Sequence, residues 1–515
     1  MKSKVIIHIK ANWKYIVFSI VLFVLTLSLV TLTNTDIGLN SYKLVNLVTD
    51  KYGFISLIMI ILFSIYIHIA NKINKEVDLS KAFLYIVIPI GILFCIVNPL
   101  GRVPDEDSHI SRAYDISYGH FFSKQDENGA AVAEFNSRMR EIVNFQNDSY
   151  EKYIEVLNKE DTGEKKISSF SNMALYSPIC HTPQAFGIFI TRLFGANIIV
   201  QLYAARVMNF IVAITLVYFA IKNIPFKKIV IFTIALLPIN LNAFASLSAD
   251  ALTISSTLFF ASYILYLKYD KNKEKLNRKD YMVLILSSII VSMCKIVYLP
   301  LCLCLFLIPN SKFDSKKEKY IKTGILFGIV VILNLLWLRF ASRFLIEYNA
   351  GVNSKEQVIF ILTNPLKYCI IILRTLNINF QNYYLGIVGN GISHMSVNIS
   401  SIYHFMLLIL LTVLFLGNED KEFDFDIFTR GIFILIFVGI IVLIFTSLYV
   451  QWTSVGKPII EGVQARYFIP ILFLIPLIFN NKTLVFNKII NYKYILLFMS
   501  YINLHAITYI MASYF

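Results

Sequence analysis

The sequence predicts an all-α membrane protein, a bundle of about 11 to 13 transmembrane helices. Of its 515 residues, 57% are hydrophobic and 15% are charged, whereas soluble domains carry about 25% charged residues. Many apolar runs reach the roughly 20 residues that a helix needs to cross a bilayer. These runs are continuous rather than alternating, which favours helices over barrel strands.

The distribution of charge orients the chain. The net charge of +15 comes largely from Lys and Arg in short links between apolar runs, the positive-inside pattern of membrane proteins. This pattern excludes nucleic acid as a partner and indicates the lipid bilayer of the cytoplasmic membrane. Lys2, Lys4, Lys10 and Lys14 precede the first apolar run, so we expect a cytoplasmic N-terminus.

Residues 1–80 are expected to form an N-terminal segment of two spans, at about 14–33 and 53–70. The first resembles an uncleaved signal anchor. A third span at about 82–100 then runs outward and opens a core of residues 81–345. Residues 101–177 are polar and should form a large external loop. Residues 178–195 contain His181, Pro183 and Arg192, and are expected to form a helix at the outer interface.

The rest of the chain returns repeatedly to the membrane. In the core, further spans are expected at about 197–221, 229–245, 251–268 and 320–342, with a hairpin of two short spans in 281–309 that turns near Lys295. Residues 346–398 should form a second external region with an interface helix at 357–375, interrupted by Asn364-Pro365. Residues 399–515 should add spans at about 399–416, 430–449, 467–480 and 493–513.

The cysteines and the common motifs exclude several functions. The six cysteines lie mostly in apolar segments without a CxxC pair, so we interpret them as small core residues. The sequence contains no P-loop, no dinucleotide-binding glycine motif, no HExxH and no GxSxG, which argues against a nucleotide-driven pump, a zinc protease and a serine hydrolase.

This topology brings distant ionisable residues to the outer boundary of the membrane. Such residues are costly at membrane depth and usually functional. They are Asp105, Glu106, His109, Arg112, His181, Arg206, Asp250, Lys295 and Arg466.

Asp105, His109 and Arg112 have the spacing of one helix face. A carboxylate here could act as a general base or hold a divalent cation such as Mg or Mn. Alternatively, the acids only complement the dipole at a helix N-terminus. Similar alternatives stay open for the others. Asp250 could cap a helix, Lys295 could reach for the interface, Arg206 and Arg466 could bind phosphate or anchor spans, and His181 could be structural.

At these residues the chain resembles the DUF2142 family of bacterial membrane proteins. The resemblance covers about 85–470 and leaves the first two spans outside; Ala465 stands where the family pattern leads us to expect Gly. The matching blocks, in order, are Pro104-Asp105-Glu106 with His109, Tyr114 and Gly119; Tyr176-Ser177-Pro178 with Pro183 to Gly187; Arg206 with Asn209; Ser246 to Leu252; Lys295 with Tyr298 and Pro300; and Gln464 to Pro470.

The family is similar to GT-C glycosyltransferases, multi-span enzymes that use a lipid-phosphate sugar donor. The resemblance implies an inverting transfer from a polyprenyl-phosphate sugar to a glycan or lipid acceptor at the outer face, with no established cofactor. It places Asp105 where these enzymes keep a catalytic acid in the first large external loop. We hypothesise that Asp105, Glu106 and His109 are the catalytic residues, with Asp250 as an assisting or cation-binding acid. Arg112, Arg206, Lys295 and Arg466 would bind the donor phosphate, and His181, Gln464 and Tyr467 would line the site.

Two other functions remain open. A transporter or flippase of lipid-linked glycans would need ionisable residues along a path through the spans, and the predicted spans carry few away from their outer ends. A polymerase or ligase of surface polysaccharide would also use external loops, so only its product distinguishes it from a glycosyltransferase.

Overall fold

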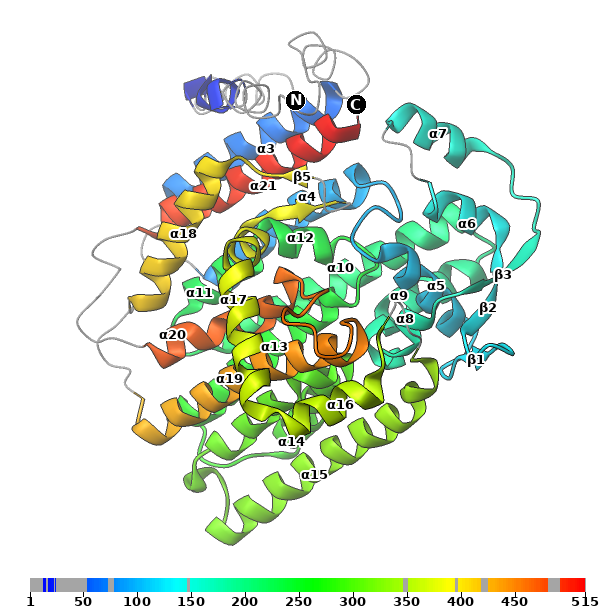
Figure 1. Cartoon of the computed structure of the whole chain (residues 1–515). Helices are drawn as coiled ribbons and strands as arrows, with labels where there is room; N and C mark the ends of the chain where they lie inside the picture. Colours follow the sequence, from blue (N-terminus) through cyan, green and yellow to red (C-terminus); the bar gives the residue numbers. More distant parts are fainter. Residues whose placement is uncertain are drawn as a thin grey trace.

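The computed structural model describes residues 13–14, 17–22, 24, 53–72, 78–145, 149–345, 351–393, 397–417, 425–479 and 491–514. The protein is mostly helical, and a smaller unit that contains strands lies at one side of the helical bundle (Figure 1). Most of the predicted span 14–33 lies outside the described residues; the parts of it that are described within 17–24 are helical.

The first half of the bundle contains most of the helices predicted from apolar runs. Helix α10 packs against α4, α9 and α13 and forms the centre of this half. The helices are α3 (Gly53–Lys72), α4 (Leu79–Val97), α10 (Ile198–Asn223), α11 (Lys228–Ala235), α12 (Pro238–Phe244), α13 (Asp250–Tyr269), α14 (Arg278–Cys294) and α15 (Lys316–Ala341).

Local sequence explains where several of these helices begin and end. The predicted span 229–245 is divided into α11 and α12 because Pro238 has no N–H for a continuous helix and begins α12 instead. Asn277 and Asp280 form a capping box that starts α14. Helix α14 ends at Cys294, Lys295 is extended, and the 3₁₀ helix η3 (Ile296–Leu307) packs back against α14. The predicted turn near Lys295 is therefore confirmed, but the returning segment is a 3₁₀ helix.

Residues 101–195 form the side unit, in which the sequence predicts a large external loop followed by an interface helix, and no strands. Its strands form an antiparallel sheet in the order β1-β2-β3. Helix α9 is only 12 residues long. It can pack closely on α10 because Gly187 has no side chain: a Cβ there would lie 2.7 Å from Ala204 O. The elements are α5 (Glu106–Ser117), β1 (Lys124–Gln125), β2 (Ala131–Asn136), α6 (Ser137–Val143), α7 (Tyr150–Asn158), β3 (Lys165–Ser169), α8 (Ser171–Ala174), η2 (Pro178–His181) and α9 (Thr182–Leu193).

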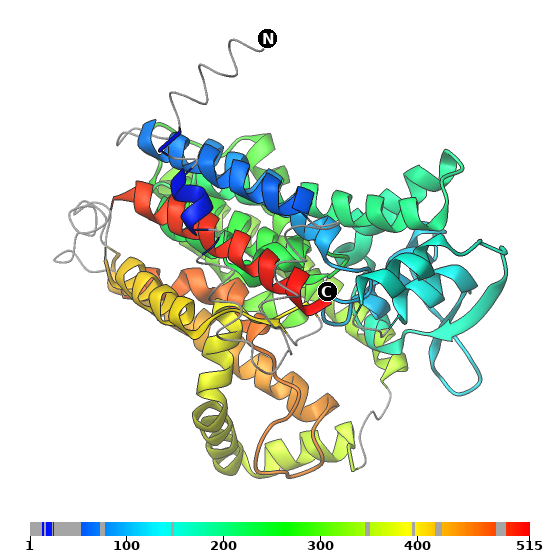
Figure 2. The same ribbon diagram turned by 90° about the horizontal axis from the view of Figure 1, so that it is seen from above.

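The second half of the chain completes the bundle, and α21 lies beside α3 (Figure 2). The predicted interface helix is two helices, α16 and α17, which meet at a bend of 108° at Asn364-Pro365. The elements are η4 (Asn310–Lys312), η5 (Ser342–Phe344), α16 (Ser354–Thr363), α17 (Pro365–Val388), β4 (Asn390–Ile392), β5 (Val397–Asn398), α18 (Ser401–Leu416), α19 (Ile427–Gln451), η6 (Ala465–Leu474), α20 (Ile475–Ile478) and α21 (Tyr492–Tyr514).

Six helices in the described part of the chain are long and apolar enough to cross a membrane, or up to seven if the bent pair α16 and α17 is one span. They are α4, α10, α13, α15 with η5, α19 and α21. Four further apolar helices, within 55–70, 296–307, 401–416 and 465–478, are shorter. A multi-pass helical membrane protein is thus confirmed; the described part of the chain contains six to seven full-length candidates, where the sequence predicts about 11 to 13 spans in the whole chain.

The helices connect two ends of different charge. Helix α4 leads into Asp105, α13 begins at Asp250, α14 leads to Lys295 and η6 begins next to Arg466; we call this the Asp105 end. The opposite ends of α10, α13 and α14 carry the basic links. There, Lys227 Nζ donates to Gly417 O at 2.6 Å and Lys312 Nζ to Asp270 O at 2.7 Å.

Candidate functional site

Two acids and two bases from four separate segments meet at the Asp105 end, and we call them the Asp105 cluster. Lys295 Nζ lies 2.9 Å from Asp250 Oδ1, and Arg466 Nε lies 3.4 Å from Asp250 Oδ2. Arg466 also donates through Nη2 to Asp105 Oδ2 and through Nη1 to Pro104 O. The cluster therefore contains Asp105, Asp250, Lys295 and Arg466, joined as an alternating row of charges.

Asp105 is the accessible member of this cluster. Its side chain is 40% exposed, whereas those of Asp250, Lys295 and Arg466 are 9%, 13% and 12% exposed. It precedes α5 with φ 60° and ψ 11° and makes no side-chain capping hydrogen bond. A left-handed backbone is uncommon for a residue other than Gly, although Asp tolerates it better than most. Asp105 thus does not serve as an ordinary cap, because its carboxylate is directed to Arg466.

Burial alone would raise the pKa of the Asp105 carboxyl. The Arg466 guanidinium and His109 lower it by more, so the pKa lies below its ordinary value. Asp105 is therefore ionised at neutral pH and can accept a hydrogen bond.

Aromatic rings cover the Lys295 ammonium group. Its Nζ lies 4.3 Å from the centroid of the Tyr467 ring and 5.5 Å from that of Tyr176, distances typical of cation–π contacts. The Tyr298 hydroxyl donates to Tyr467 O at 2.8 Å and ties η3 to η6. Tyr467 therefore lies at the cluster, as expected from its motif, and half-buried Gln464 immediately precedes η6.

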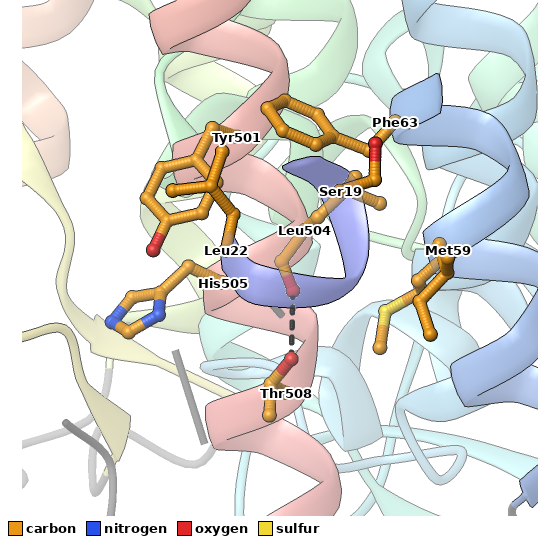
Figure 3. A pocket seen from close by; sticks show the side chains of 9 residues that line it. Ser19, Leu22, Met59, Phe63, Tyr501, Leu504, His505 and Thr508 are labelled. Carbon is orange, nitrogen blue, oxygen red and sulfur yellow. Dashed lines mark hydrogen bonds between the residues drawn. The ribbon is translucent and has the colours of Figure 1, made fainter. Parts of the chain in front are cut away.

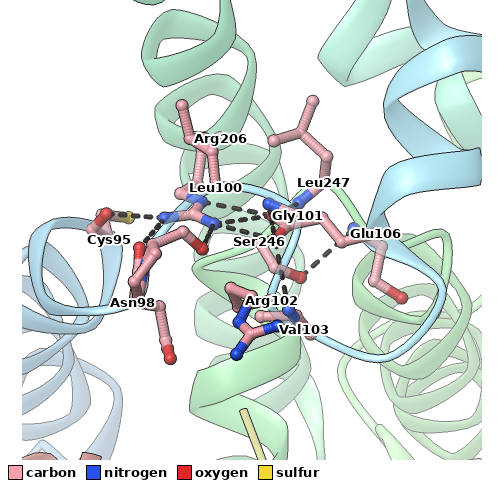
Figure 4. A network of polar contacts seen from close by, with 12 residues as sticks. Cys95, Asn98, Leu100, Gly101, Arg102, Val103, Glu106, Arg206, Ser246 and Leu247 are labelled. Carbon is pink, nitrogen blue, oxygen red and sulfur yellow. Dashed lines mark hydrogen bonds and ion pairs between the residues drawn. The ribbon is translucent and has the colours of Figure 1, made fainter. Parts of the chain in front are cut away.

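Next to the cluster lies a fully buried ion pair of Glu106 and Arg206, both 0% exposed (Figure 4). Arg206 Nη2 lies 2.8 Å from Glu106 Oε1 and 2.9 Å from Oε2. The other guanidinium hydrogens are donated to the carbonyls of Cys95, Asn98 and Pro99. All Arg206 nitrogens are thus engaged, and the expected phosphate contact of Arg206 does not fit this geometry.

Glu106 links the segments that carry the cluster. Its carboxylate accepts from the backbone N–H groups of Gly101, Val103 and Leu247, at 3.0, 3.3 and 3.0 Å. Leu247 belongs to the link 246–250 that leads to Asp250. The expected catalytic role of Glu106 is therefore replaced by a structural one, since no Glu106 oxygen is exposed to a substrate.

Two amide side chains hold the same link. Asn209 Nδ2 donates to Ser246 O at 2.7 Å and to Ser248 O at 3.1 Å. Gln184 Nε2 donates to Leu247 O and Ser248 O, both at 3.3 Å. Together with Glu106, these contacts fix the link before Asp250, and they join motif residues that lie far apart in the sequence.

His109 and His181 form a buried pair beside the cluster. His109 Nδ1 lies 2.8 Å from His181 Nε2, and His181 Nδ1 lies 3.2 Å from Cys180 Sγ. Burial lowers the pKa of His109 to about 4 against the raising effect of Asp105 and Asp250. Both rings are 3% exposed or less, and we expect them to be neutral at pH 7 because burial also lowers the pKa of His181.

Arg112 is turned away from Asp105. It pairs with Asp115 at 3.0 Å and donates to His120 O and Phe121 O. His120 Nδ1 lies 2.8 Å from the other Asp115 oxygen. Arg112 is fully buried, so the expected contact of Arg112 with a donor phosphate does not fit either.

The described side chains do not form a metal site. Among them no group of three or more His, Cys, Asp or Glu residues could hold a metal ion. Asp105 and Asp250, the acids at the cluster, are engaged by Lys295 and Arg466. This donor set does not fit a resident Mg or Mn ion.

A separate small pocket lies between α3, α21 and residues 19–22 (Figure 3). Both ring nitrogens of His505 in its wall lack a hydrogen-bond partner in the described part of the chain. None of the lining residues belongs to the Asp105 cluster. They are Ser19, Leu22, Met59, Ile60, Phe63, Tyr501, Leu504, His505 and Thr508.

Fold and site together define a polytopic helical membrane protein with a charged cluster at one end of its bundle. The chain belongs to the family described as "Predicted membrane protein (DUF2142)", which matches residues 88–475. This range contains the whole Asp105 cluster and leaves out α3 and α21. No curated protein and no solved structure matches the chain significantly.

Sequence reasoning missed two residues that contact predicted site residues, and it noted one departure from the family pattern. Cys180 was interpreted as a core residue, and the adjacent His181 was the only hint of its contact. Asp115, three residues after Arg112, gave a spacing signal for their ion pair. Ala465, where Gly was expected, requires no unusual backbone, and its methyl group faces Gly386, where a Cβ would come within 2.4 Å.

Proposed function

We propose that this protein is a membrane glycosyltransferase that transfers a sugar from a polyprenyl-phosphate donor to a glycan or lipid acceptor of the cell envelope. The observation that carries the proposal is the Asp105 cluster, in which an accessible carboxylate lies against Arg466, with Lys295 joined through Asp250. A carboxylate suits a hydroxyl that must lose a proton, and the two cations suit a departing phosphate.

The charge of the two ends supports a site outside the cytoplasm. The basic residues at the end opposite Asp105 lie in the last turns of α10 and α13 or in links between helices: Lys222, Lys227, Lys268 and Lys312. Basic links face the cytoplasm in most helical membrane proteins. The Asp105 end would then face outward from the cytoplasmic membrane, with the N-terminus inside.

Exposed apolar side chains of the side unit support access from the lipid. Phe122 is 65% exposed and Phe194 is 85% exposed, on the same unit that carries Asp105. Large exposed apolar side chains are costly in water and suit the membrane interface. A lipid-linked donor could therefore approach the cluster along the bilayer surface.

The proposed reaction is a single displacement. The acceptor hydroxyl oxygen forms a bond to the anomeric carbon while the bond between that carbon and the phosphate oxygen breaks. Asp105 takes or orients the hydroxyl proton, and polyprenyl phosphate leaves with the bonding electron pair. Arg466 and Lys295 stabilise the phosphate charge, and Asp250 holds the two cations in place before the donor arrives.

The test is transfer in membranes that contain the full chain. The envelope glycans of a gene deletion, compared by mass and sugar composition, identify which polyprenyl-phosphate sugar to label. We expect labelled product with one new glycosidic bond and release of polyprenyl phosphate. Movement of label across the bilayer without a new bond would indicate a flippase, and chains of repeat units would indicate a polymerase or ligase; either result would contradict the proposal.

A further inference from the structure

The buried pair His109 and His181 continues to Cys180, and the three side chains form one row of hydrogen bonds. Cys180 Sγ donates to Ser177 O at 3.0 Å. A thiol has a single hydrogen, so the sulfur can only accept at its other contact. That contact is His181 Nδ1, at 3.2 Å. When the thiol hydrogen is donated to Ser177 O, His181 Nδ1 carries the hydrogen of the His181 ring.

The same reasoning fixes the next ring. A neutral imidazole that is protonated at Nδ1 has a lone pair at Nε2, so His181 Nε2 accepts. Its partner at 2.8 Å is His109 Nδ1, which then carries the hydrogen of the His109 ring. The Nε2 atom of His109 is left as an acceptor; the side-chain hydrogen bond found for His109 among the described residues is the one at Nδ1.

The row is held in place because the end formed by Cys180 and His181 is buried and packed. Cys180 and His181 are both 0% exposed, and Cys180 packs with Ala249, Leu252 and Cys294. Ala249 immediately precedes Asp250, and Cys294 precedes Lys295. The row and the cluster are thus held by the same segments.

The surroundings of the pair place His109 toward the cluster. The charged groups that act on His109 are Asp105, Asp250, Arg466 and Lys295, whereas Arg112 acts on His181. The rings of His109 and Tyr176 lie edge to face with centroids 6.0 Å apart, and Tyr176 also covers Lys295. His109 therefore lies between the buried row and the Asp105 cluster.

We propose that Cys180 and His181 are positioning residues, which hold His109 with its hydrogen on Nδ1 and its Nε2 lone pair available to a substrate hydroxyl at the Asp105 cluster. The hydroxyl partner rests on the proposed glycosyl transfer, whereas the ring state does not. An acceptor hydroxyl then has two oriented contacts, one with Asp105 and one with His109. The second contact fixes the orientation of the bound acceptor.

The ring state is measured directly by ¹⁵N NMR of histidine-labelled full-length protein in lipid. Neutral rings protonated at Nδ1 and at Nε2 give different ¹⁵N shifts. The chain has eight histidines, and we expect two neighbouring rings protonated at Nδ1, assigned by their loss in His109→Gln or His181→Gln. Protonation of His109 at Nε2 in the parent protein would overturn the proposal without any variant.

Cys180 variants provide the second measurement. In Cys180→Ala the acceptor at His181 Nδ1 is lost, and we expect the Nδ1-protonated signal of His109 to decrease with a mixture of both ring states. In Cys180→Ser the hydroxyl can still donate to Ser177 O and accept from His181, so the parent spectrum should return. An unchanged spectrum in folded Cys180→Ala would overturn the role of Cys180.

Kinetics separates this inference from the proposed function. With a transferring parent, Cys180→Ala should raise the KM for the acceptor about tenfold with a smaller change in KM for the donor, and Cys180→Ser should restore it. Equal changes in both KM values would contradict a role in acceptor positioning. If the parent protein shows the expected ring states but transfers no sugar, the proposed glycosyltransferase function is contradicted. The proposed positioning of the His109 ring would still stand.

Discussion

The Glu106–Arg206 pair and the Asp105 cluster are neighbouring regions built from the same residue types. The pair is 0% exposed, and each guanidinium nitrogen has a partner. The cluster contains a carboxylate that is 40% exposed and two cations, Arg466 and Lys295, that are 12% and 13% exposed. Two adjacent acids of one sequence motif thus differ in their surroundings: Glu106 is buried and holds segments together, and Asp105 stays accessible.

The largest expected loss of stability follows from breaking the buried pair. Arg206→Met leaves the Glu106 carboxylate buried without its cation, and we expect a loss of about 3–5 kcal/mol in the free energy of unfolding. Denaturant unfolding in detergent measures it. Arg206→Lys keeps the charge but cannot reach Glu106 and the carbonyls of Cys95 and Asn98 together, so its loss should be smaller. Equal losses of stability in Arg206→Met and Arg206→Lys would indicate that the packing of Arg206, and not its charge, determines its contribution to stability.

At the Asp105 cluster, we expect a substitution to reduce the rate of sugar transfer. Arg466→Lys retains a positive charge but cannot contact Asp105 and Asp250 at the same time, as the guanidinium does. We expect transfer to fall about 100-fold, the effect of removing one oriented donor to a developing charge. The measurement is kcat/KM for the donor. A change below about threefold would remove Arg466 from the phosphate site.

Acidification should destabilise the region around His109. The unfolded ring binds a proton below its ordinary pKa of 6.5, and the folded ring only below about 4. Between these values the unfolded state binds more protons, so stability is present above pH 6.5 and falls by up to about 3 kcal/mol toward pH 4. Unfolding at several pH values should show this slope, and His109→Gln should reduce it. The same slope in that variant would assign it to other groups.

The smallest effect is expected at an exposed ion pair outside both regions. Lys457 and Glu461 pair with side chains 40% and 42% exposed. Lys457→Met should change the free energy of unfolding by less than about 1 kcal/mol and leave transfer unchanged. A loss of stability as large as that in Arg206→Met would show that burial does not determine how much an ion pair contributes to stability.

Much of the fold was predictable because long apolar runs dictate helices. The runs that became α4, α10, α13 and α19 were predicted to within a few residues. The sheet of the side unit was missed because β2 and β3 are separated in the sequence by residues 137–164, and no clear apolar alternation marks either strand. The breaks at Pro238 and Pro365 follow from proline chemistry.

The site was predictable as a set of residues but not as a set of pairs. The ordered motifs indicated Asp105, Asp250, Lys295 and Arg466, which do meet. The ion pair between Arg206 and Glu106 joins residues 100 positions apart, and it could not be derived from one sequence. Pairing across such distances depends on helix packing, and a single chain gives no direct signal for it.

The comparison of Asp105→Asn with Asp107→Asn tests the central claim most directly. Asn tolerates the left-handed backbone at Asp105, so both variants should keep a free energy of unfolding within about 1 kcal/mol of the parent. Asp107 lies one residue beyond Glu106 and makes no ion pair among the described residues. We predict that transfer per folded molecule falls at least about 100-fold in Asp105→Asn and stays near the parent level in Asp107→Asn. Transfer at the parent level in Asp105→Asn would contradict the account.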